Sequence, residues 1–442
     1  MQTILKTITR RLREHPEIAD WSLQRAELRS TQRYLIGNIT ESRRNVERVV
    51  YPLTIYHDHE GPDGEPSRGV AGVTILADGS NLEAALDEAV LMASLVNNRP
   101  YSLPGPAVYP DVPIAAAAIL ERPVEVADEL LVRLRAAVER EPDVRLSSAE
   151  VFLEERRTTL YNSRGVKAEA LGTSLLLDFV LLAGQGANEM ESHIAVERRR
   201  LEDLDIEALV ARQAGYARDA LRTTTPRTGR GAVVLRDEAL VDLLGNYESE
   251  GVLAFHTSAR AKYLELSRLE EGELVTLGRP IVGDRLTYTG TRRLPFGLHS
   301  GPFDGDGLPA EEIEVIRDGV LQRRWASQRY ADYLGLAPTG AFGNALVPAG
   351  QASFDELLQE ARVQIVSFSW MNPDTVTGDF VAEIRLGYER DGDVWRPIRG
   401  GSLSGNLFAA LADVRFSRET GFFGHYQGPV AARFGELTIS GS

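Results

Sequence analysis

One histidine stands in a stretch that could form a metal-binding helix. Residues 251–265 read Gly-Val-Leu-Ala-Phe-His-Thr-Ser-Ala-Arg-Ala-Lys-Tyr-Leu-Glu, which is a helical composition with His256 in its first half. A hydrolytic zinc helix needs a second ligand about one turn on, and a carboxylate beside the first histidine as general base. Here Thr257 takes the carboxylate position, and Arg260 and Ala261 take the positions one turn on. The sequence therefore predicts a helix placed for a metal site but lacking its ligands.

Two further pairs of histidines could bind a metal. On a strand, His57 and His59 would face the same way, so two-ligand binding is geometrically possible. The adjoining loop is polar and rich in glycine and proline, which favours a solvated edge. His256 and His425 form a second pair, but no matching carboxylate accompanies them. We expect no bound metal and no cofactor.

A glycine-rich loop, Gly301-Pro-Phe-Asp-Gly-Asp-Gly307, carries two carboxylates. A calcium loop is excluded because the remaining oxygen ligands and the terminal glutamate are out of place. A phosphate loop is excluded because no Lys-Ser/Thr follows. The favoured interpretation is a tight turn in which glycine lets the backbone approach a neighbour closely. Ser258, two residues after His256, is not a nucleophile with a base, because such neighbours point apart on a helix.

The first half of the chain alternates helices with runs of strands. Apolar periodicity predicts the following elements: helices at 2–16, 80–96, 123–139 and 203–222, and strands within 21–76 and 144–162. Ser80 and Glu83 have the spacing of a capping box at the start of the second helix. The order of helix, meander and turn occurs twice, which suggests an internal duplication of 1–100 and 123–222.

The second half is richer in strands. Residues 223–231 have no large apolar side chain and are predicted to be a linker. Asp318-Gly319 is a strong hairpin signal, and Ser353 with Glu356 forms a second capping box. Strands not regularly interleaved with helices favour an α+β fold. We expect two domains: an N-terminal helix and strand-meander domain at 1–222, and a predominantly antiparallel β domain with short helices at 232–442.

Composition narrows the classes of function. The net charge of −15, from 49 basic and 64 acidic residues, disfavours nucleic-acid binding. Basic clusters at Arg10–Arg13 and Arg198–Arg200 are predicted to be solvated helix faces, and Arg227–Arg230 lies in the expected linker. No apolar run reaches the roughly 18 residues of a membrane helix, and no signal core follows Met1. With no cysteine in the chain, a cytoplasmic location is the default expectation.

Several short motifs occur in a specific order. They are Tyr161–Gly165 in the first half, then Ser300–Gly307, Val315–Leu321, Gly335–Gly340, Thr377–Phe380 and Ser404–Leu407 in the second half. Each match alone is weak, but their order and spacing make the whole specific. On these motifs the chain resembles the TldD/PmbA family, historically called modulators of DNA gyrase and now regarded as peptidases.

The resemblance implies a particular branch of that family. The catalytic branch carries His-Glu-x-x-x-His and a cysteine near the C-terminus. Here only His256 remains, and Gly421–Gln427 occupies the cysteine region without a cysteine. The sequence therefore resembles the metal-free branch, PmbA or TldE, which pairs with a zinc-bearing TldD chain. No catalytic residue is expected.

By the same resemblance, the substrate would be an extended peptide and the partner a TldD-like chain or a second copy. The candidate residues for the peptide cleft are His256, Ser300, Phe303, Asp304, Gly307, Thr377 and Gly378. Two alternatives stay open. One is a self-sufficient homodimeric peptidase with an altered active site, and the other is a regulatory binding protein, for example of a toxin–antitoxin or gyrase system.

Overall fold

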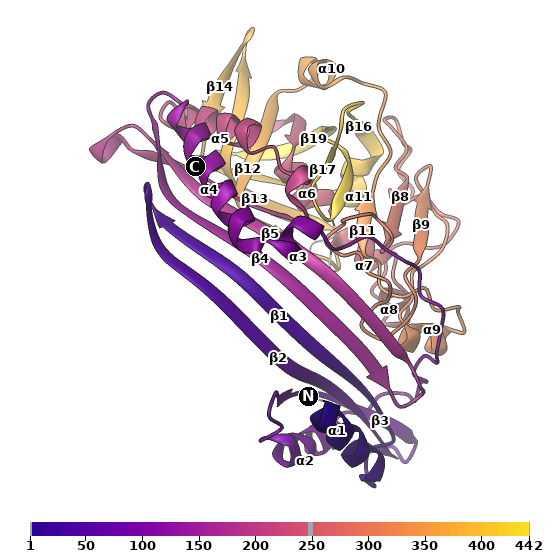
Figure 1. Cartoon of the computed structure of the whole chain (residues 1–442). Coiled ribbons are helices and arrows are strands. Elements are labelled where there is room, and N and C mark those ends of the chain that lie inside the picture. Colours follow the sequence, from indigo (N-terminus) through magenta and orange to yellow (C-terminus); the bar gives the residue numbers. More distant parts are fainter. Residues whose placement is uncertain (1, 246–250, 442) are drawn as a thin grey trace.

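Three β-sheets and the helices that cover them make up the described part of the chain, residues 2–245 and 251–441 of a computed structural model (Figure 1). The architecture is α+β with mostly antiparallel pairing, as the sequence predicts. One sheet belongs to the first half of the chain and two belong to the second half. Among the described helices, none has both the length and the apolar composition that crossing a membrane requires.

The first sheet is a long antiparallel platform in the order β3-β2-β1-β4-β5-β6. Its strands are β1 (Asp20–Ile36), β2 (Ile39–Glu60), β3 (Pro66–Leu76), β4 (Val144–Asn162), β5 (Lys167–Ala183) and β6 (Met190–Arg198). At about 3.3 Å per residue, the longest strand extends over roughly 70 Å. Figure 1 shows these strands running diagonally beneath the second half of the chain.

Helices cover one face of this platform. They are α1 (Gln2–Glu14), α2 (Leu82–Ser94), α3 (Ala117–Glu121), α4 (Pro123–Glu139) and α5 (Ile206–Ala220), with 3₁₀ turns at Gly186–Asn188 and Leu201–Asp203. Leu23 packs in the cluster under α1 and α2, and Leu35 in the cluster under α4. Both positions are odd-numbered on β1, so the two clusters lie on the same face. Each half of the platform thus runs helix, three strands, helix, and we propose an internal duplication on that ground.

One predicted cap is wrong. The helix α2 begins after Asn81 and not after Ser80, and it has no side-chain cap. Asn81 instead turns back to the preceding strand, where its side chain accepts from Leu76 N–H and donates to the Thr74 carbonyl. The carboxylate of Glu83 forms an ion pair with Arg11 on α1, so it does not return to the helix start.

The second half contains a closed barrel of five strands. Going round, these are β12 (Val363–Pro373), β7 (Gly229–Arg236), β19 (Ala431–Ser440), β15 (Ser402–Asn406) and β13 (Asp379–Asp391), which pairs again with β12. The strands β14 (Val394–Ile398) and β16 (Val414–Phe416) attach to it. β7 starts inside the stretch predicted as a linker, and residues 223–228 hold only an isolated bridge at Thr224.

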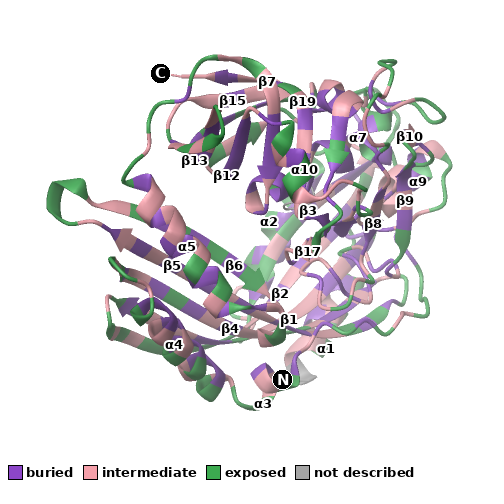
Figure 2. Cartoon of the chain, turned by 90° about the horizontal axis from the view of Figure 1, so that it is seen from above, coloured by how far each residue is buried: buried purple, intermediate pink, exposed green. Residues whose placement is uncertain are grey.

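A smaller sheet packs beside the barrel. Its order is β10 (Val320–Leu321), β9 (Glu312–Arg317), β8 (Tyr288–Thr291), β11 (Asn344–Leu346), β18 (Tyr426–Pro429) and β17 (Thr420–Phe422). The helices of this half are α6 (Glu238–Leu244), α7 (Val252–His256), α8 (Ala259–Tyr263), α9 (Gln328–Leu334), α10 (Phe354–Gln359) and α11 (Leu407–Ala410), with a 3₁₀ turn at Leu411–Asp413. One apolar core joins the barrel and the sheet (Figure 2).

Two local predictions in this half are confirmed. Asp318 and Gly319 have φ of 50° and 77° in the turn between β9 and β10, as a two-residue hairpin requires. Ser353 and Glu356 form the reciprocal bonds of a capping box at the start of α10.

The two halves meet on the face of the platform that the helices leave open. There, Phe303 packs with Leu160, Val166 and Ala168 of the platform. Arg199 donates to the carbonyls of Gly297 at 2.7 Å and Leu298 at 2.6 Å, among others. The prediction that Arg198–Arg200 form a solvated helix face is therefore wrong: Arg198 ends β6, and Arg199 joins the two halves.

Candidate functional site

The predicted helix at 251–265 is two short helices, so that prediction is wrong in its continuity. α7 ends at His256, and Ser258 is extended, with φ −84° and ψ 148°, before α8 begins. The Ser258 hydroxyl accepts from Ala261 N–H, which makes it an N-cap and not a nucleophile. The break is also fixed from outside, because Trp325 N–H donates to the Thr257 carbonyl and the Trp325 carbonyl accepts from Ala259 N–H.

His256 is fully buried at the end of α7. Its Nδ1 accepts from Arg268 N–H at 3.0 Å, and its ring meets the Phe408 ring edge-on at 4.9 Å. Its Nε2 is buried near the backbone of Thr375 and Val376, and among the described residues no partner reaches normal hydrogen-bond geometry. Burial lowers the pKa of His256 to about 4, although this backbone favours the charged ring. The imidazole is therefore neutral at neutral pH.

The surroundings of His256 do not fit a zinc ion. A catalytic zinc site uses three protein ligands and keeps one open position. The Thr257 hydroxyl already donates to the Leu253 carbonyl, and Arg260 is a cation. Across residues 2–245 and 251–441, no three His, Asp or Glu side chains come close enough together to hold a metal ion. The one buried Nε2 atom has no companion ligand.

Thr377 and Gly378 lie in the turn that covers His256. The Thr377 carbonyl accepts from Arg268 Nη1 at 2.9 Å and from Asn406 Nδ2 at 3.0 Å. Gly378 has φ +78°, and a Cβ there would sit 2.4 Å from the Phe408 ring. His256, Thr377 and Gly378, three of the predicted cleft residues, therefore belong to one packed cluster.

Ser300 serves the framework of the smaller sheet. Its hydroxyl donates to the Leu294 carbonyl at 2.6 Å and accepts from Asn344 Nδ2 at 2.8 Å. Asn344 is itself fully buried and also donates to the Thr291 carbonyl. Both hydrogen-bonding capacities of the Ser300 hydroxyl are used inside the protein, and the side chain is not displayed to a ligand.

Asp304 organises the glycine-rich loop. Its Oδ1 accepts from the N–H groups of Asp306, Gly307 and Leu308 at 2.9 to 3.0 Å, and its Oδ2 from Ala341 N–H at 3.1 Å. The carboxylate is buried. This confirms a tight turn, and it fixes the loop tip, Gly305 and Asp306, in space.

Phe303 and Gly307 dock this loop on the platform. Phe303 meets the Tyr109 ring edge-on at 5.6 Å, and the Gly307 carbonyl accepts from the Tyr109 hydroxyl at 3.0 Å. Gly307 has φ +95°, and a Cβ there would lie 3.0 Å from Leu160. The close approach that glycine permits is therefore an approach to the other half of the chain.

His425 lies in a different place, on the wall of a cavity of about 240 Å³ between β6, α6 and the 423–425 turn. Its ring stacks on His299 at 5.6 Å. Burial lowers the pKa of His425 to about 4, helped by the positive charge of Arg198 and by His299. Asp242 lines the same cavity, and burial raises its pKa to about 6.

His57 and His59 do face the same way at the end of β2, and their rings stack 5.1 Å apart. Each is held by the protein, however. His57 Nδ1 contacts the Glu17 carbonyl at 2.7 Å, and His59 Nε2 contacts Asn97 Oδ1 at 3.1 Å. Asp58 between them pairs with Arg68 at 2.6 Å and is not placed as a third ligand.

The predicted site residues thus fall into two groups, one around His256 and one in the loop 300–307, and most of them are buried and internally bonded. Sequence reasoning missed the residues that bond to these two groups or are positioned by them. Among them are Arg268 and Asn406 beside His256, and Asp306 at the loop tip. Asp306 was visible within the glycine-rich loop 301–307, but nothing in the sequence placed it against β1–β3.

Comparisons with known proteins agree on one family. A model of the PmbA/TldA metallopeptidase C-terminal domain matches residues 228–441. Over 302 residues the chain is 26% identical to the metalloprotease PmbA of Escherichia coli O157:H7, which covers 65% of this chain and 64% of that protein. Over 308 residues it is 23% identical to a zinc metalloprotease TldD homolog of Saccharolobus solfataricus, covering 64% and 66%. The chain thus matches just under two thirds of the length of each relative.

Solved structures share the whole fold. TldE from Thermococcus kodakarensis superposes with a TM-score of 0.79 at 15% identity and covers 100% of both chains. A putative modulator of a DNA gyrase from Thermotoga maritima superposes with a TM-score of 0.77 at 18% identity, covering 99% of this chain and 100% of that one. At such identities the likeness establishes the fold alone.

Proposed function

Because the chain belongs to the TldD/PmbA family, we propose that it is the zinc-free, PmbA/TldE-like subunit of a metallopeptidase system whose zinc comes from a TldD-like partner. In this system the chain shapes a cleft for an extended or unfolded peptide, and the partner cleaves that peptide. The chain has no catalytic residue of its own.

The observation that carries this proposal is the state of His256. The imidazole is sealed from solvent, and one of its nitrogens accepts a backbone hydrogen bond. A threonine and an arginine stand where a base and a second ligand would be needed. A neutral, buried imidazole packed against Phe408 acts as part of the core and not as part of a reaction centre.

The peptide role draws support from the arrangement of the predicted cleft residues. Asp304, Gly307 and Ser300 fix the loop that joins the halves, and Thr377 and Gly378 fix the turn over His256. Their role in this proposal is to hold the walls of a cleft, and neighbouring side chains touch the peptide. The platform also has two edge strands, β3 and β6, to which an extended peptide can add as a further strand.

The test is to measure zinc and peptidase activity of the chain alone and co-expressed with a TldD-like protein that carries the full zinc motif. We expect no stoichiometric zinc and no casein hydrolysis by the chain alone, and EDTA-sensitive hydrolysis by the co-purified pair. One zinc per chain that disappears in His256→Ala would refute the proposal. EDTA-sensitive hydrolysis by the chain alone would instead establish the self-sufficient homodimer.

A further inference from the structure

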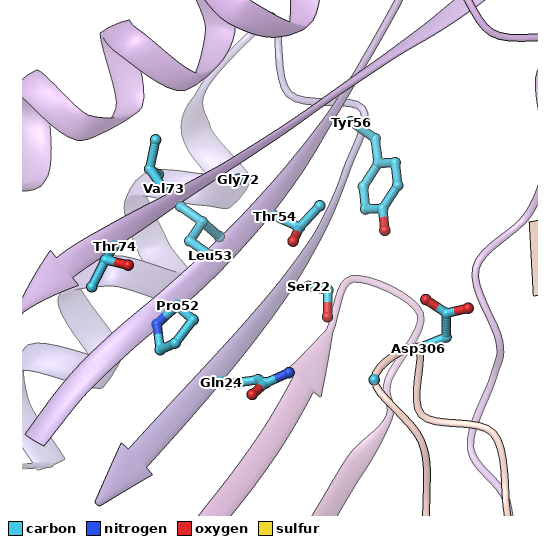
Figure 3. A pocket seen from close by; sticks show the side chains of 11 residues that line it. Ser22, Gln24, Pro52, Leu53, Thr54, Tyr56, Gly72, Val73, Thr74 and Asp306 are labelled. Atoms are coloured by element: carbon cyan, nitrogen blue, oxygen red, sulfur yellow. The ribbon is translucent and has the colours of Figure 1, made fainter. Parts of the chain in front are cut away.

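A polar groove lies where the loop tip 305–306 faces the platform (Figure 3). It has a volume of about 450 Å³. Ser22 and Gln24 of β1 and Thr54 and Tyr56 of β2 line one side, and Asp306 closes the other. These strand positions are even-numbered, so they lie on the face opposite the helices. The groove therefore belongs to the open face where the two halves meet.

Four polar side chains of this groove, Ser22, Gln24, Thr54 and Tyr56, have no hydrogen-bond partner in the part of the chain that the structure describes. Tyr56 is only 5% exposed, yet its hydroxyl has no hydrogen-bond partner among the described residues. The hydroxyl oxygen still reaches the groove, where a ligand can bond to it. Figure 3 shows Ser22, Tyr56 and Asp306 around the same space. Unused donors and acceptors along two extended strands are suited to a ligand with a regular polar backbone.

Asp306 places a carboxylate at a defined position in the groove. Its position is set by the loop that Asp304 holds through three backbone N–H groups. In the part of the chain that the structure describes, no Lys or Arg comes within 4.0 Å of its carboxylate, and only the Gln328 backbone favours the ionised form. Burial, and then the charge of Asp304, raise the pKa of Asp306 to about 6.

Arg68 of the platform, beside Tyr56, is already paired with other carboxylates. Arg68 packs near the Tyr56 ring at 5.7 Å, but its guanidinium is already paired with Asp58 at 2.6 Å and with Asp20 at 3.1 Å. Asp306 is half-buried, and a ligand that brings a cation offsets the cost of removing its carboxylate from water. The missing component of the groove is therefore a positive charge.

We propose that this groove binds an extended peptide segment with a cationic group, a Lys or Arg side chain or an α-ammonium, against Asp306. The hydroxyls and amide of Ser22, Gln24, Thr54 and Tyr56 would bond the peptide backbone. This inference rests on the proposed function and adds to it a class of substrate. The net charge of −15 also favours the approach of basic segments.

The experiment measures binding of fluorescent eight-residue peptides to the full chain by anisotropy. Three peptides separate the sources of the cation: an acetylated peptide with a central Lys, the same peptide with Gln, and the Gln peptide with a free N-terminus. We expect the acetylated Lys peptide, or the Gln peptide with a free N-terminus, to bind about tenfold more tightly than the acetylated Gln peptide.

The variants assign that preference to the groove. Asp306→Asn should remove it and leave binding of the acetylated Gln peptide unchanged, and Asp306→Glu should retain part of it. Tyr56→Phe should weaken the binding of all three peptides. Asp393→Asn is the matched control, because it removes one exposed carboxylate from the distant β13–β14 turn. Circular dichroism and the melting temperature establish that each variant is folded.

Three outcomes would overturn the inference: no preference for a cationic peptide, a preference that survives Asp306→Asn, or an equal loss in Asp393→Asn. The proposed function is judged separately. If partner-dependent hydrolysis stands while the preference is absent, only the groove assignment fails. If no peptide binds and the pair hydrolyses nothing, the proposed function fails.

Discussion

Acidification from pH 7 to pH 5 should destabilise the native chain more than a His256→Asn variant. His256 is fully buried, and burial lowers its pKa to about 4, with the nearby charges of Arg268 and Arg324 acting in the same direction. In the unfolded chain the same ring has its ordinary pKa of about 6.5. Between these two values the unfolded state binds a proton that the folded state does not.

The sign and size of the effect follow from this difference. Because the unfolded state takes up the proton first, stability is lost as the pH falls from about 6.5 towards 4. With each pKa unit equal to about 1.4 kcal/mol, the loss between pH 7 and pH 5 is about 2 kcal/mol. Asparagine does not titrate here, and it keeps an acceptor near the Arg268 N–H. All other groups titrate in both proteins and cancel in the comparison.

The assay is urea unfolding at pH 7, 6 and 5, followed by circular dichroism, with the free energy of unfolding compared between the two proteins. Ile384→Val is the control, because it removes one buried methyl group of the barrel and no titrating group. It should lower stability by a similar amount at every pH. If the native chain and His256→Asn lose the same stability on acidification, the burial argument for His256 is refuted.

Three further changes test the loops. Gly378→Ala should lower the free energy of unfolding by about 1–3 kcal/mol, because its φ is +78° and the new Cβ meets Phe408. Gly392→Ala, also at positive φ but in open space, should cost less. Urea unfolding measures both changes. Asp304→Asn should weaken the backbone bonds of the loop, and proteolysis at 304–308 should become faster. Ser353→Ala should cost about 1 kcal/mol, measured in the same way, with faster hydrogen exchange in the first turn of α10.

Local patterns predicted the elements whose formation depends on neighbours in sequence. The helix at 123–139 and the strand at 144–162 have the predicted bounds, because proline at the helix start and strong periodicity define them locally. The Asp318-Gly319 turn was readable for the same reason: its left-handed backbone favours these two residues.

Distant contacts decided the features that the sequence did not predict. Trp325 splits the expected helix by pairing with Ser258, and Asn81 takes the cap position by bonding back to β3. The barrel closes because β12 pairs with both β7 and β13, which are far apart in the chain. Arg199 looked like part of a charged surface, yet its partners are carbonyls of the other half. Such pairings leave no periodic signal.

For the candidate site, the sequence located single residues but not the space that they enclose together. The lack of a second ligand beside His256 follows from Thr257 and Arg260 alone. The groove that contains Tyr56 and Asp306 does not follow from the sequence, because Tyr56 comes from β2 and Asp306 from a loop in the second half of the chain. Only the fold brings them to the same space.

The residues that carry the family motifs hold the architecture through bonds within the protein. Asp304 accepts four backbone N–H groups, Ser300 bonds Asn344, and His256 accepts from Arg268, so each is bound to the protein itself. In the proposed function these residues hold the walls of a groove for a peptide, and in the proposed groove the charge of Asp306 selects which peptide is held.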